Sequence, residues 1–126
     1  MSRQIIQTSN APAALGPYSQ AVRHGDLVFL SGQVALDPVT GQLVGGGIDA
    51  QTRQVFRNLQ AVCEAAGGSL EGVLKLNIFL TDLGNFATVN EIMAETFSAP
   101  YPAGATVEVS ALPLGAEVEM EAVLGL

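Results

Sequence analysis

A chain of 126 residues is long enough to bury the core of one domain, and we expect a single domain over residues 1–126. Its net charge of −7 argues against a nucleic-acid partner, because affinity for phosphates comes from clustered Lys and Arg. No apolar run approaches the ~20 residues of a membrane-spanning helix, so we expect no membrane partner either.

The first third of the chain predicts three strands. A short strand is expected at 4–8, a second at 18–23 after a turn rich in Pro and Gly, and a strongly apolar third at 27–36. The Ser-Gly-Gln segment 31–33 interrupts the third strand. A glycine inside a strand predicts a bulge or a close approach of the backbone to another group.

The middle of the chain alternates helix, strand and helix. Apolar residues recur at helical spacing from Asp49, the expected cap, to about Ala66. The strand at 73–80 places Leu74, Leu76, Ile78 and Leu80 on one predicted face. Asp82 is expected to cap a second helix, which Pro100 and Pro102 end.

Two runs of alternating apolar and polar residues, separated by the turn at 112–116, predict a closing strand pair at 106–111 and 117–122. The resulting order is β-β-β-α-β-α-β-β. The simplest α+β solution for this order is a mixed six-stranded sheet with two helices on one face.

Acidic residues dominate one predicted face of the last strand, at Glu117, Glu119 and Glu121, and Glu108 is expected across from them. Like charges in such positions repel, so the row needs water, partners or a use. A solvated face is one interpretation. Burial in a cleft is the other, and it would raise a glutamate's pKa and suit it to acid–base work. For the sole lysine, Lys75, a structural ion pair is favoured over a Schiff base.

The single histidine and the single cysteine are interpreted as structural. His24 lies in a predicted turn, and Cys63 lies beside the apolar stripe of the first helix. Together they cannot supply a protein-only zinc site, and we expect no metal. One cysteine also excludes an internal disulfide, which fits a reducing compartment and predicts a cytoplasmic protein.

The order and spacing of several motifs resemble those of the RidA (YjgF) family over nearly the whole chain. The segments that carry the resemblance are NAPAALGPYSQAV (10–22), SGQ (31–33), EAAGG (64–68), KLNIFLTDL (75–83), FATVNEIM (86–93) and PAGATVEVSALPLGAEVEMEAV (102–123).

The resemblance implies a chorismate-mutase-like fold and a homotrimer around a central barrel, with ligand clefts between subunits. Only 13% of residues are charged, which independently favours an oligomer. The implied activity is hydrolysis of reactive 2-imino or 2-enamino acids to 2-keto acids and ammonia, without metal or cofactor. The implied cleft residues are Tyr18, Ser31, Asn90 and Thr106, which bind substrate, and Glu119, which orients or activates water or favours the iminium.

Gly104 departs from the family pattern, in which Pro-Ala is followed by an arginine that binds the substrate carboxylate. A guanidinium makes two parallel bonds to a carboxylate that no other residue reproduces. Losing one partner of such a pair costs about 2–5 kcal/mol, so we expect impaired activity.

Several alternatives to a simple loss of activity stay open. One alternative is natural divergence to a small-molecule-binding or chaperone-like module whose pocket takes a neutral or cationic ligand. Another is an engineered site that takes a non-carboxylate ligand. A further alternative is that glycine simply suits the backbone there.

Overall fold

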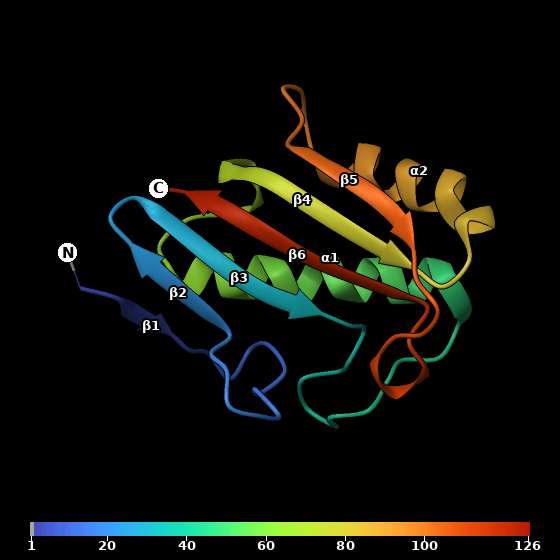
Figure 1. The fold of residues 1–126 in the computed structure, drawn as a ribbon, viewed down its shortest axis with the longest axis horizontal. Helices are drawn as coiled ribbons and strands as arrows, with labels where there is room; N and C mark the ends of the chain where they lie inside the picture. The colour runs from blue at the N-terminus through green and yellow to red at the C-terminus, as the bar shows by residue number, and fades with distance from the viewer. Residues whose placement is uncertain (1) are drawn as a thin grey trace.

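The computed structural model describes residues 2–126 as one six-stranded sheet with two long helices on one of its faces (Figure 1). This confirms the α+β expectation and the predicted order of elements. The strands and helices are β1 (Gln4–Ile6), β2 (Ala21–His24), β3 (Leu27–Gln33), α1 (Gly47–Ala65), β4 (Val73–Leu80), α2 (Phe86–Thr96), β5 (Ala103–Glu108) and β6 (Val118–Gly125), with short 3₁₀ turns η1 (Leu70–Gly72), η2 (Leu83–Asn85) and η3 (Pro113–Gly115).

The strands lie in the order β1-β2-β3-β6-β4-β5, and only the β4–β5 pair is parallel. The expected pairing of the two closing strands is therefore wrong, because β4 lies between them. The reason is the connection through α2. It carries the chain from β4 back to a parallel neighbour, as a strand-helix-strand crossover does, and leaves the other edge of β4 for β6.

The core fills the layer between the sheet and α1. Leu59 and Val62 of α1 and Val118 and Met120 of β6 are all fully buried. Cys63 is buried among them, as the sequence predicted, and this burial raises the pKa of its thiol to about 12. The thiol is a packing group and not a nucleophile.

Three local expectations were wrong. The N-cap of α1 is Gly46, and Asp49 lies within the first turn of that helix. Asp82 accepts a hydrogen bond from the Gly84 N–H and caps η2 instead of α2. Leu74 is exposed because β4 carries an extra residue between Val73 and Lys75, which turns its side chain away from the core.

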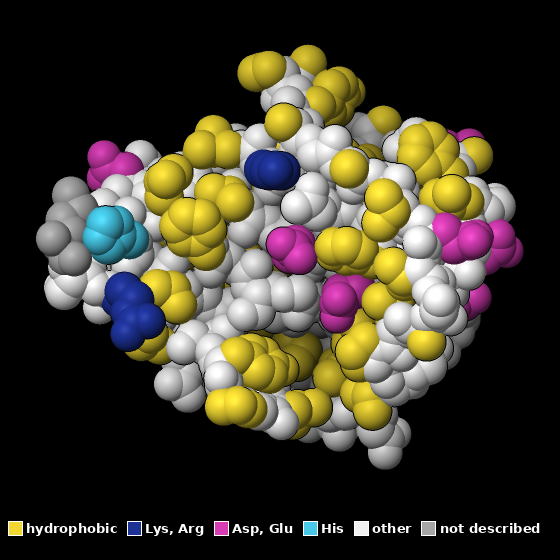
Figure 2. All heavy atoms as spheres, in the orientation of Figure 1, with side chains coloured by type: hydrophobic (Ala, Val, Ile, Leu, Met, Phe, Trp, Pro, Cys, Tyr) yellow, Lys and Arg dark blue, Asp and Glu magenta, His cyan; other side chains and the backbone are white. Residues whose placement is uncertain are grey.

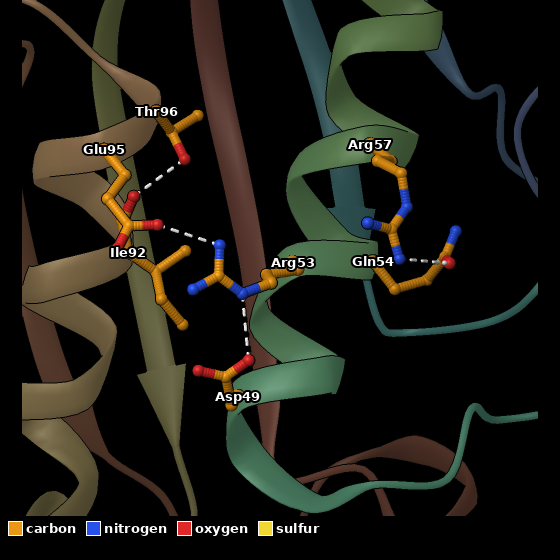
Figure 3. A network of polar contacts seen from close by, with 7 residues as sticks. All are labelled: Asp49, Arg53, Gln54, Arg57, Ile92, Glu95 and Thr96. Atoms are coloured by element: carbon orange, nitrogen blue, oxygen red, sulfur yellow. Dashed lines mark hydrogen bonds and ion pairs between the residues drawn. The ribbon is translucent and has the colours of Figure 1, made fainter.

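An exposed ion-pair network joins the two helices on their outer side (Figure 3). The Arg53 guanidinium lies 2.9 Å from a carboxylate oxygen of Asp49 on its own helix and 2.9 Å from one of Glu95 on α2. Arg57 donates to Gln54 at 3.1 Å. The two Arg53 contacts are ion pairs, whereas the structure of residues 2–126 shows no ion pair for Lys75, so that expectation was wrong.

The opposite face of the sheet has no helix over it, and Figure 2 shows apolar side chains spread across this open face. Pairing in register places Val22, Phe29, Val123 and Lys75 in one row on this face. Phe29 is 51% exposed. In the part of the chain that the structure describes, no helix is long and apolar enough to cross a membrane.

Candidate functional site

The irregular segment before β2 is anchored by the hydrogen bonds of a buried side chain, Gln20. Its amide nitrogen donates to the carbonyl oxygens of Thr8 (3.0 Å) and Pro12 (2.8 Å), and its amide oxygen accepts from the Thr8 N–H at 2.7 Å. The chain between these residues has no regular structure, so the Gln20 hydrogen bonds replace a sheet ladder. They fix the segment that carries Tyr18.

Tyr18 and Ser31 both belong to this part of the site, but they do different things. The Tyr18 ring is about half exposed, and its hydroxyl accepts from the Leu15 N–H at 3.2 Å. The Ser31 hydroxyl donates to the Ser19 carbonyl at 2.6 Å, which ties β3 to the segment. Ser31 therefore supports the Tyr18 segment through a bond to the backbone.

Gly32 lies at an irregularity in the pairing of β3 with β6, between Leu30 and Gln33. A Cβ at this position would lie 3.0 Å from the carboxyl carbon of Glu119. Both predictions made for the Ser-Gly-Gln segment are thus confirmed, since the strand is irregular there and another group packs closely on its backbone. Glycine leaves room for the carboxylate of Glu119 beside β3.

These residues enclose a cavity of about 270 Å³ between the Tyr18 segment, the start of β6 and the end of β3. Figure 2 shows a hollow on this face, close to acidic side chains near its middle. The residues lining the cavity are Pro12, Ala13, Leu15, Tyr18, Gln20, Gly32, Gln33, Val34, Leu36, Pro113, Leu114 and Glu119. Glu119 is the single charged residue of this lining.

Burial raises the pKa of Glu119, and the neighbouring charge of Glu121 raises it further. The expected acidic row is only partly correct. Glu117 precedes β6 and binds Gln51 of α1, with its N–H donating to the amide oxygen at 2.9 Å. Glu108 lies on β5 and accepts from the Leu83 N–H. The close pair is therefore Glu119 and Glu121.

The remaining predicted site residues, Asn90, Gly104 and Thr106, do not line this cavity. Pairing in register puts Thr106 in one row with Ile78 and Met120, on the face that the helices cover. Glu119 lies in a row with Phe79 on the open face. Asn90 is exposed on α2.

Gly104 belongs to this second group, because it pairs with Leu76 in β4. A Cβ built at position 104 would overlap with the carbonyl oxygen of Leu76. With the backbone in this position, residue 104 cannot carry a side chain unless β5 shifts.

Sequence reasoning singled out Glu119 and Tyr18 but missed Gln20, although Gln20 lies inside a quoted motif. A glutamine gives no signal of burial in a sequence, because its type is usually exposed. Only the tertiary structure shows that Gln20 is 4% exposed and that both the oxygen and the nitrogen of its amide form hydrogen bonds.

A family profile described as Endoribonuclease L-PSP matches residues 8–124. The crystal structure of RidA from an Antarctic Psychrobacter is 54% identical to this chain, covers 98% of it and 99% of its own chain, and superposes with a TM-score of 0.95. The chain belongs to the RidA family.

Other RidA-family relatives carry names that state an activity. The mouse 2-iminobutanoate/2-iminopropanoate deaminase is 46% identical over 121 residues, covering 96% of this chain and 90% of its own. Reactive Intermediate Deaminase A of Arabidopsis thaliana is 46% identical over 126 residues, which is all of this chain and 67% of the plant protein. The family assignment from the motifs is confirmed.

Proposed function

We propose that this RidA-family chain is an imine deaminase that hydrolyses reactive 2-imino or 2-enamino acids to 2-keto acids and ammonia. The observation that carries the proposal is Glu119, a carboxylate at the wall of a cavity in a chain 46% identical to a named deaminase. The E. coli relative TdcF, 38% identical with a TM-score of 0.90, was crystallised with bound serine.

In the proposed reaction, an enamine first tautomerises to the imine. The oxygen of water then bonds to the imine carbon while one of its protons passes to the nitrogen, which gives a carbinolamine. The hydroxyl proton of that carbinolamine next passes to the nitrogen, the C–N bond breaks, and ammonia leaves as the keto C=O forms. Glu119 supports these steps in either protonation state. Burial and the charge of Glu121 raise its pKa and so favour the protonated form, which can donate a proton, while the ionised form orients water or stabilises the iminium.

The complete cleft lies between two copies of the chain in a homotrimer. Two observations support this proposal. Glu119 and Thr106 lie on opposite faces of one sheet, so a single copy cannot bring them to the same ligand. The exposed Phe29 row on the open face also needs a cover, because such apolar patches are typical of protein interfaces.

Gly104 makes this form weakly active toward substrates that carry a carboxylate. Without a guanidinium, an anionic substrate meets only the negative charge of Glu119. Removing one partner of a buried charge pair costs about 2–5 kcal/mol, roughly 30- to 4,000-fold in rate or binding.

The test measures hydrolysis of 2-aminoacrylate, generated in the cuvette by a dehydratase, for this protein, for Glu119→Gln and for Glu71→Gln. Glu71 is an exposed carboxylate in η1 and controls for the loss of one charge. We expect slow hydrolysis that falls at least tenfold in Glu119→Gln and is unchanged in Glu71→Gln. Background rates in all three proteins would contradict a deaminase.

RNA cleavage, which the name of the family profile suggests, is a weaker candidate. The chain carries five Lys and Arg against twelve Asp and Glu, which works against phosphate binding. RNA binding that appears at low ionic strength and weakens steeply with salt would favour that candidate. The cytoplasmic location stays a prediction from the single cysteine.

A further inference from the structure

The lining of the cavity carries a negative charge and no positive one. Among residues 2–126, no Arg or Lys lines it, and Glu119 contributes a carboxylate. Arg53 and Arg57 are on α1, which covers the face of the sheet opposite to the open face (Figure 1). Arg23 donates to the Gly25 carbonyl at the β2–β3 turn. None of these three arginines is placed to neutralise an anion in this cavity. Lys75 lies on the open face, four residues along β4 from the partner of Glu119, and neither it nor Arg3 lines the cavity.

In the proposed cleft between two copies, the positions that the family resemblance assigns to the neighbouring copy carry no cation. These positions are Gly104, which has no side chain, and Thr106, which is neutral. A Cβ at position 104 would also overlap with the Leu76 carbonyl, so the backbone as it stands leaves no room for a side chain there. A carboxylate ligand would therefore lie beside Glu119 with no compensating cation.

The rest of the wall favours an apolar ligand body. Val34 and Leu36 are buried beneath the cavity, while Leu15 and Leu114 are 72% and 62% exposed at its rim. The Tyr18 ring completes the lining, and a tyrosine face attracts a cation as well as an apolar group. At about 270 Å³ the cavity is slightly smaller than common ligand pockets of about 300–1,000 Å³, which suits a ligand of one ring.

We propose that this cleft selects ligands that combine an ammonium or iminium nitrogen with a small uncharged apolar body, and that it discriminates against carboxylates. The nitrogen lies against Glu119, and the body lies between Tyr18 and the leucine rim. This inference rests on the proposed function only in taking the Glu119 cavity as the ligand cleft. It does not require hydrolysis.

The test compares benzylammonium with benzoate, which share a ring and differ in the sign of their charge. Binding is measured by calorimetry or by NMR chemical shifts at mildly alkaline pH and low salt. We expect benzylammonium to bind at least tenfold more tightly than benzoate. We expect Glu119→Gln to remove this preference and Glu71→Gln to keep it.

Three results would overturn the inference: benzoate binding as tightly as benzylammonium, a preference that survives in Glu119→Gln, or no binding of either compound. Thermal unfolding of Glu119→Gln shows whether that variant is folded, so a lost preference cannot be mistaken for a lost fold.

Failure of this inference is distinguishable from failure of the proposed function. A Glu119-dependent preference for benzylammonium with no 2-aminoacrylate hydrolysis would support the inference and contradict the deaminase. Rapid hydrolysis that pyruvate inhibits and benzylammonium does not would support the deaminase and contradict the inference.

Discussion

The carboxylate of Glu119 is the residue in which the charge and the burial of this site meet. It lies beside Gly32, where the absent side chain leaves room for it, and near Glu121 on the same strand face. Burial partly excludes water from the Glu119 carboxylate, and the negative charge of Glu121 lies close to it. Both effects favour the protonated form of Glu119.

Glu119→Gln should make the folded protein more stable at alkaline pH. The folded pKa of Glu119 is raised, so the stability linked to its protonation is present at low pH and is lost as pH rises through that pKa. The amide cannot ionise and avoids this loss. Urea unfolding between about pH 4 and 8 should show a gap in the free energy of unfolding that grows with pH. Glu71→Gln, measured alongside, should show no growing gap, and the same gap in both variants would contradict the assignment.

Substitutions at Gly104 should lower the free energy of unfolding, whether or not they restore activity. Because a Cβ there meets the Leu76 carbonyl, Gly104→Ala and Gly104→Arg must shift β5, at a cost of about 1–3 kcal/mol typical of overpacking. Chemical denaturation measures the loss. Ala103→Ser, at the exposed neighbouring position, is the control and should be nearly neutral.

Activity gives Gly104→Arg a second readout. A folded variant that hydrolyses 2-aminoacrylate much faster than the parent would show that β5 can move and that the missing guanidinium limits the reaction. Unchanged stability in both Gly104 variants would show that glycine is not required there.

Among the elements, the irregular segment before β2 depends on tertiary hydrogen bonds more than any strand does. Gln20 satisfies its backbone at Thr8 and Pro12, whereas strands satisfy one another. The same segment forms one wall of the cavity through Leu15 and Tyr18. Order in this segment and shape of the cavity are therefore linked.

Gln20→Ala should lower the free energy of unfolding by about 2–3 kcal/mol, because it leaves buried backbone groups without partners. It should also speed hydrogen exchange of the Thr8 amide more than that of amides in β4. Gln42→Ala, at an exposed loop position, serves as the matched control and should change neither quantity. Exchange at Thr8 as slow as in the parent would contradict the role given to Gln20.

For the whole molecule, the proposed homotrimer depends on the open face of the sheet. Phe29 lies between the apolar residues Val22 and Val123 in its row, and a charge there would be buried against apolar neighbours in the proposed trimer.

Phe29→Asp should convert a particle of about three times 13.0 kDa into one of 13.0 kDa, as measured by light scattering. Val39→Asp is the control, because Val39 is 92% exposed in the loop between β3 and α1. A parent protein that is already a monomer, or a Phe29→Asp variant that stays a trimer, would contradict the proposed interface.

The sequence by itself determined the elements and the family. Alternation at 76–80 and helical spacing in 49–66 reflect which face of each element packs against the core, and this information is local. Motif order identified RidA, and the Ser-Gly-Gln segment at 31–33 correctly indicated an irregular strand in close contact with another group.

Only the tertiary structure decided which strands are neighbours and which predicted site residues meet. The closing strands were expected to pair, but the α2 crossover places β4 between them, and this puts Thr106 and Glu119 on opposite faces. The burial of Gln20 and the space available at Gly104 also depend on groups distant in sequence. Such contacts arise from packing between elements, and local sequence patterns do not encode them.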